Sequence, residues 1–91
     1  FPGISMSQNY PNPSKGVTDV IVNINSIIYE NTDNQLIIRD ITGRIVELFP
    51  LNLKQGENKI TLNNHMNLKG LFLISLQING IVIQTNKMLL Y

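Results

Sequence analysis

Apolar and polar residues alternate with a period of two over most of the chain. The stretch 70–78, GLFLISLQI, is the clearest example, because every second residue from Phe72 to Ile78 is large and apolar. Successive side chains of a β-strand point to opposite faces, so this alternation is typical of strands. The same criterion predicts strands at residues 17–25, 35–41, 44–49, 59–62, 70–78 and 81–90, with a possible edge strand at residues 4–8.

Turn signals separate these stretches. Asn79-Gly80 is the dipeptide preferred in type I′ hairpins, so residues 81–90 are expected to fold back antiparallel on residues 70–78. Pro50 is expected to end the strand that begins at residue 44, and KQGEN at 54–58 to form another turn. Because residues 70–78 are apolar on both faces near their start, we expect that strand to be central in its sheet.

The composition supports an all-β fold. The chain has no alanine, and its asparagines fall mostly between the apolar stretches, where this residue favours turns. Short strands separated by such turns predict an antiparallel immunoglobulin-like β-sandwich of about seven strands. We expect residues 9–91 to form this domain, and residues 1–8 to be the end of a linker that includes the possible edge strand.

Size and charge exclude several classes of function. The chain has 91 residues, enough for one small domain, and a net charge of +1 with scattered cations, so no basic patch predicts nucleic-acid binding. Without cysteine there is neither a disulfide framework nor a thiolate metal site. No apolar run is long enough to cross a bilayer, so we expect no membrane insertion. A start at Phe1 instead of methionine suggests a fragment of a longer polypeptide.

Few residues offer catalytic or metal-binding chemistry. His65 is the only histidine, and a Ser/His/Asp arrangement with Ser75 or Ser26 lacks any nucleophile elbow, so we expect no enzyme and no catalytic residue. A calcium site formed by Glu30, Asn31 and Asp33 is an alternative to a plain polar loop, but no EF-hand spacing supports it. We therefore expect no metal and no cofactor.

Two further groups of residues have both a structural and a functional interpretation. The sequence from Asp40 to Arg44 suits a tight hairpin in which the carboxylate accepts backbone N–H bonds, and it is also a candidate Asp/Arg recognition spot. The aromatic residues are candidates either for core packing, which we favour, or for a sugar-binding platform made of Tyr10, Tyr29, Phe49, Phe72 and Tyr91.

Four short motifs occur in order along the chain: NYPNP at 9–13, DITGRIV at 40–46, GLFLISL at 70–76 and TNKMLLY at 85–91. Together they resemble the type A C-terminal sorting domain of the type IX (Por) secretion system of Bacteroidetes. Phe72 stands where that family usually has tyrosine, and Tyr91 where a polar or basic residue is common. The resemblance assigns a signal or recognition role to Tyr10, Pro11, Asn12 and Pro13, to Asp40, Gly43 and Arg44, to Gly70, and to Lys87, Met88, Leu89 and Leu90.

The resemblance implies a secretion signal instead of an enzyme. Such domains direct an N-terminal cargo of the same precursor from the periplasm across the outer membrane. Their expected partners are the type IX outer-membrane translocation machinery and a sortase-like peptidase, and the cargo ends on the cell surface or outside the cell. The alternative is a non-catalytic structural or carbohydrate-binding module of a secreted enzyme or adhesin.

A mechanism for recognition follows from the predicted last strand. Residues 81–90 have no following segment to cover them, so we expect an open edge whose backbone groups pair with a strand of the receptor. The rigid prolines at 11 and 13 are expected to hold Tyr10 and Asn12 extended and to seat the first strand.

Overall fold

The computed structural model of the chain describes residues 3–25, 32–64 and 66–91. These residues contain no helix, and hence no helix able to cross a membrane. They form seven strands: β1 (Ile4–Met6), β2 (Val17–Ile24), β3 (Asn34–Asp40), β4 (Ile45–Leu51), β5 (Gly56–Asn63), β6 (Gly70–Ile78) and β7 (Ile81–Leu90).

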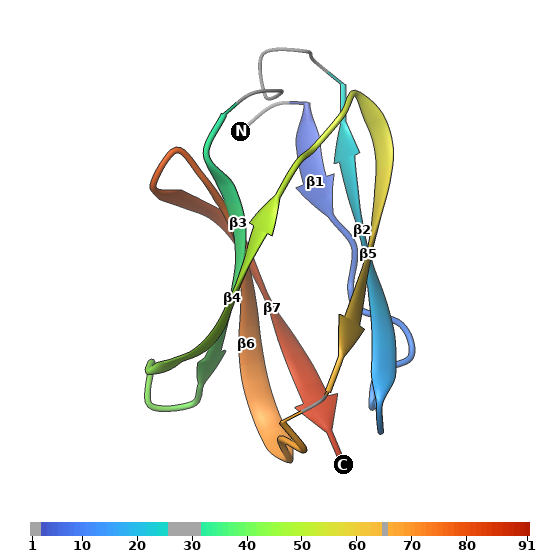
Figure 1. The fold of residues 1–91 in the computed structure, drawn as a ribbon, viewed down its shortest axis with the longest axis vertical. Coiled ribbons are helices and arrows are strands. Elements are labelled where there is room, and N and C mark those ends of the chain that lie inside the picture. The colour runs from blue at the N-terminus through green and yellow to red at the C-terminus, as the bar shows by residue number, and fades with distance from the viewer. Residues whose placement is uncertain (1–2, 26–31, 65) are drawn as a thin grey trace.

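The strands form two antiparallel sheets that face each other (Figure 1). One sheet has the order β1-β2-β5 and the other has the order β4-β3-β6-β7. This is a sandwich consistent with the immunoglobulin-like fold, so the predicted fold class is confirmed. As predicted, β6 is central in its sheet and β7 folds back on it.

The core lies between the inner faces of the two sheets. On β2 the alternating residues Val20, Val22 and Ile24 are all fully buried, as their period of two predicts. From the other sheet, β6 contributes its own alternating set, Phe72, Ile74, Leu76 and Ile78. Burial of these side chains is the main source of stability for a domain that has no disulfide.

The hairpin predicted at Asn79-Gly80 is confirmed. Asn79 and Gly80 have φ values of 50° and 81°, the left-handed conformations that a type I′ turn requires. Strands β6 and β7 have the bounds expected from the pattern.

Several predicted strand boundaries differ from the structure by one to three residues. β4 continues through Pro50 to Leu51, because β4 is an edge strand, where a proline is tolerated. The predicted turn at 54–58 is wrong in its second half, because β5 already begins at Gly56, which pairs with Ile24. The first strand ends at Met6 instead of residue 8, and beyond it the segment keeps only isolated backbone contacts with β2, at Ser7 and Tyr10.

Candidate functional site

The proline-rich motif at 9–13 is fixed against the start of β2. Tyr10 and Asp19 exchange two backbone hydrogen bonds of 2.9 Å. The buried Asn9 side chain donates to the hydroxyl of Thr18 at 3.0 Å and to the carbonyl of Pro11 at 3.1 Å, and Thr18 also donates to Pro11 at 2.8 Å. The motif is therefore held by its own polar side chains. Both X-Pro bonds in it, Tyr10-Pro11 and Asn12-Pro13, are cis.

The same segment also runs along the outer edge of β7. The backbone N–H of Leu89 donates to Asn12 Oδ1 at 2.9 Å, and the Leu89 carbonyl accepts from the N–H of Ser14 at 2.9 Å. The N–H of Tyr91 donates to the Ser14 carbonyl at 3.0 Å, and Gln8 Nε2 donates to the Lys87 carbonyl at 2.6 Å. We call this contact between residues 8–14 and 87–91 the terminal clasp.

The clasp changes the interpretation of β7. An added strand would need the outward backbone groups of β7, but the Lys87 carbonyl and both groups of Leu89 already make the bonds described above, as does the N–H of Tyr91 just beyond the strand. The expectation of an open edge is therefore wrong for this half of the strand. The clasp also joins two motifs that lie at opposite ends of the chain, which the sequence alone did not indicate.

Further along the same edge, side chains of β7 bind the β1 segment. Gln84 Oε1 accepts from the N–H of Met6 at 3.0 Å, while Gln84 Nε2 donates to the Met6 carbonyl at 2.6 Å. Asn86 Nδ2 donates to the carbonyl of Ser7 at 3.2 Å. Side-chain amides thus bridge the two sheets where no backbone ladder forms.

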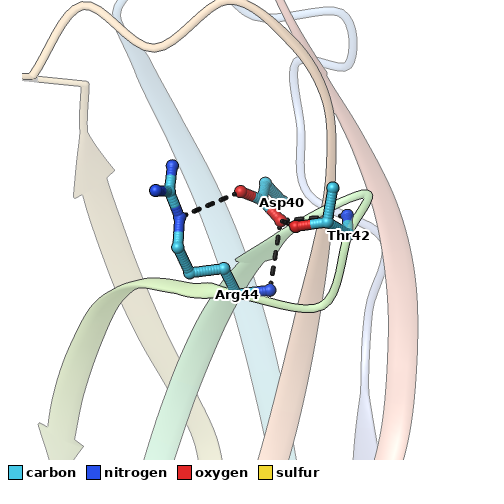
Figure 2. A network of polar contacts seen from close by, with 3 residues as sticks. All are labelled: Asp40, Thr42 and Arg44. Carbon is cyan, nitrogen blue, oxygen red and sulfur yellow. Dashed lines mark hydrogen bonds and ion pairs between the residues drawn. The ribbon is translucent and has the colours of Figure 1, made fainter.

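The Asp40 motif forms the predicted hairpin between β3 and β4 (Figure 2). Asp40 Oδ1 accepts from the backbone N–H of Thr42 at 2.9 Å and of Arg44 at 3.1 Å, as expected from the sequence, and from the hydroxyl of Thr42 at 2.5 Å. Its second oxygen lies 3.3 Å from Arg44 Nε. Gly43 has a φ of 90°, which allows the tight return of the chain.

The hairpin network affects the protonation of Asp40. The hydroxyl of Thr42 has the largest effect and lowers the pKa of this carboxyl, while desolvation raises it. The backbone N–H groups of Arg44 and Thr42 and the guanidinium of Arg44 lower the pKa further, so the net shift is downward. Because the Arg44 side chain is largely exposed, the ion pair contributes little to stability. The network is explained as a turn-stabilising device without any ligand.

Strand register links the remaining predicted residues. Gly70 pairs with Leu90, and Phe72 pairs with both Asp40 and Met88, so the hairpin lies toward the clasp end of the sandwich (Figure 1). Gly70 has a φ of 111°, a conformation strained for any residue with a side chain. The hairpin motif connects β3 and β4, on one side of the β6–β7 pair. The proline motif lies on the other side of this pair, along the outer edge of β7.

The sequence did not indicate the polar residues that hold the proline motif and make the clasp. Gln8, Asn9, Ser14 and Thr18 were not among the predicted site residues, although they flank the prolines. Proline cannot donate a backbone hydrogen bond, so a segment with two prolines needs other partners for its polar groups. The amide and hydroxyl side chains beside the prolines could have indicated those partners.

Several alternatives considered from the sequence find no support in the described residues. Phe72 is buried in the core and so cannot belong to an exposed sugar-binding platform. No group of three or more potential metal ligands occurs within residues 3–25, 32–64 and 66–91. His65, Ser26, Tyr29, Glu30 and Asn31 lie outside the described residues.

A pocket opens between the sheets near the β5–β6 connection. It is lined mainly by apolar residues, among them Phe49 and Leu62, and Glu47 is the only titratable residue in its described lining. A single carboxylate does not provide the paired groups of an acid–base mechanism.

Comparisons with known proteins identify the family. The family model described as "Secretion system C-terminal sorting domain" matches residues 8–90, which begin and end within the terminal clasp. No curated protein and no solved structure gives a match. The matched region covers strands β2 to β7 and all four motifs except Tyr91, and the family consists of non-catalytic signal domains. The chain therefore belongs to the secretion system C-terminal sorting domains, which act as signals for type IX secretion.

Proposed function

We propose that this chain is a type A sorting domain of a Bacteroidetes protein, and that it carries an N-terminal cargo through the periplasm and across the outer membrane. Its direct partners are the outer-membrane translocation machinery and a sortase-like peptidase that separates it from the cargo. The cargo then remains on the cell surface or is released. The domain itself acts without catalysis.

The observation that supports this proposal most directly is the terminal clasp within the family match over residues 8–90. The clasp brings Tyr10 to Pro13 beside Lys87 to Leu90, so the exposed residues assigned to the signal from both ends of the chain, such as Asn12 and Leu89, form one surface. Such a surface exists only in the folded domain, and the machinery would therefore read a folded signal instead of a linear peptide.

The test is a fusion of residues 1–91 to the C-terminus of a fluorescent protein that folds in the periplasm and carries a Sec signal. In a Bacteroidetes host, the fusion should reach the surface or the medium only when the type IX translocon is intact. Retention in the periplasm of both strains, with the domain shown to be folded, would contradict the proposal.

Variants then test the assigned residues. Because Met88 and Leu90 are buried in the core, deletion of the final residues would disturb folding as well as recognition. Tyr10 is a better choice, since its side chain is 81% exposed and its backbone is held by Asp19 of β2. Tyr10→Ser should lower secretion severalfold without changing the thermal unfolding midpoint. Unchanged secretion would remove Tyr10 from the signal.

A further inference from the structure

The outer face of the four-stranded sheet is unusually apolar. Residues that oppose one another in antiparallel strands share a face, so the register fixes which side chains point away from the core. On this face they are Ile45, Leu48 and Pro50 of β4, Gln35, Ile37 and Arg39 of β3, Leu71, Leu73, Ser75 and Gln77 of β6, and Val82, Thr85, Lys87 and Leu89 of β7.

Several large side chains of this outer face remain accessible to solvent. Ile45 and Leu48 on β4 are 48% and 49% exposed, and Leu71 and Leu89, which pair across β6 and β7, are each 42% exposed. Between them Leu73 is half-buried and Ile37 is buried. The accessible apolar residues therefore lie toward both edges of the sheet, on β4 and on β6 and β7. Accessible apolar side chains grouped on one face are typical of protein interaction sites.

The charges on this outer face are of one sign. Arg39 and Lys87 are its only charged residues, and they flank Leu73 in a single cross-strand row. Strands lie about 4.8 Å apart, so the two cations project from points about 10 Å apart. Neither forms an ion pair with any residue in the described part of the chain. A complementary surface would present apolar side chains and carboxylates to this row.

We propose that this outer face docks a protein surface of the secretion machinery that is apolar and carries carboxylates opposite Arg39 and Lys87. The inference rests on the proposed function and specifies the surface through which it acts. The occupant is a component of the machinery and not a second copy of the domain, because two-fold pairing of this face would supply no carboxylate to Arg39 and Lys87. Lys87 thus serves twice, with its backbone in the clasp and its side chain on the docking face.

The test compares matched substitutions on the two sides of the sandwich in the secreted fusion. Leu48→Ser and Lys87→Glu change the docking face. Val17→Ser and Lys59→Glu change the other outer face, where Val17 is 52% exposed and so matches Leu48 in accessibility. Circular dichroism and thermal unfolding of each purified variant establish that it is folded.

Each docking-face variant is expected to reduce translocon-dependent secretion at least tenfold and to accumulate folded in the periplasm, while both controls are secreted as efficiently as the wild-type fusion. Equal secretion of all variants would overturn the docking face but leave the sorting function intact. Failure of the unsubstituted fusion to require the translocon would instead overturn the proposed function. The two failures are therefore distinguishable.

Two further measurements examine other occupants of the same face. Sedimentation of the purified chain should show a monomer, and a dimer that Leu48→Ser dissociates would assign the face to self-association. Vesicles of phosphatidylglycerol should not retain the chain, and retention abolished by Lys87→Glu would assign the face to an anionic lipid surface. Either result would overturn the protein-docking proposal.

Discussion

The two outer faces of the sandwich differ in chemistry although the same alternation of residues produces both. The outer face of the β1-β2-β5 sheet is largely polar, and its central carboxylate, Asp19, accepts a hydrogen bond from Thr61 at 2.8 Å and lies 3.6 Å from Lys59 Nζ. The face of the β4-β3-β6-β7 sheet carries accessible leucine and isoleucine side chains and cations that lack carboxylate neighbours on that face.

This difference separates residues needed for the fold from residues available to a partner. A polar outer face whose carboxylate is paired within the domain is satisfied by solvent and by its own side chains, and needs no partner protein. The accessible apolar side chains of the other outer face contribute little to the stability of the isolated domain beyond their strand propensity, because they lie outside the core. The asymmetry is explained if one side of the domain remains in solvent while the other meets a protein of the secretion machinery.

The largest expected effect is a loss of stability that differs between substitutions on the inner and outer faces of β6. Ile74→Ala removes a side chain that is fully buried in the core and should lower the free energy of unfolding by about 2–5 kcal/mol. Leu71→Ala, on the outer face of the same strand, should cost less than about 1 kcal/mol. Urea denaturation of the chain measures both. Similar losses for both variants would mean that Leu71 is packed as core, and the comparison between the outer faces would fail.

A smaller effect is expected at the terminal clasp, which joins the border of the apolar face to the proline motif. Asn12→Ala removes the acceptor for the Leu89 N–H and should cost about 1 kcal/mol. Hydrogen exchange of the Leu89 amide should accelerate, because this N–H then faces solvent. Asn23→Ala, at an exposed position of the polar face, serves as the control. An unchanged exchange rate in Asn12→Ala would contradict the clasp geometry.

Charges on the two faces should respond differently to removal. Lys59→Ala breaks the pair with Asp19 and should cost less than about 1 kcal/mol, a loss that decreases at high salt because the pair is exposed. Arg39→Ala should leave stability nearly unchanged at any salt concentration, since Arg39 has no carboxylate partner among the described residues. A clear stability loss in Arg39→Ala would show that its charge is used within the fold.

The smallest expected effect depends on pH and concerns the hairpin beside the apolar face. Because the folded state lowers the pKa of Asp40, its contribution is fully present above the unfolded pKa, about 4, and is lost as the pH falls through the lower folded value. Between about pH 4 and 2 the stability of Asp40→Asn should therefore fall less steeply than that of the wild type. Parallel pH profiles would contradict the lowered pKa.

Much of the fold was predictable because it depends on local patterns. The strands around Ile74 and Val20, the Asn79-Gly80 turn and the carboxylate-capped hairpin at Asp40 each follow from residues adjacent in sequence, and all were confirmed. The errors lie at Pro50 and Gly56, where the position of a strand within its sheet decided the boundary. Edge or central position depends on strand order, which a local pattern does not contain.

The candidate site was only partly predictable for the same reason. The resemblance assigned roles to Asn12 and Leu89 separately, but their hydrogen bond joins residues that are 77 positions apart. The sequence did not indicate a role for Arg39, because its proposed role in docking depends on its place in a cross-strand row with Leu73 and Lys87. Both the Asn12–Leu89 hydrogen bond and the cross-strand row result from contacts between segments that are distant in sequence.

The sequence by itself thus determined the all-β class, the buried alternation, the turns and the resemblance to a sorting domain, because each is encoded by residues close together along the chain or by the order of short motifs. The tertiary structure alone decided that the edge of β7 is closed by residues 8–14 and that one outer face is apolar and cationic. Both features depend on which strands are neighbours in the sheets, and the strand order is determined by the packing of the whole core.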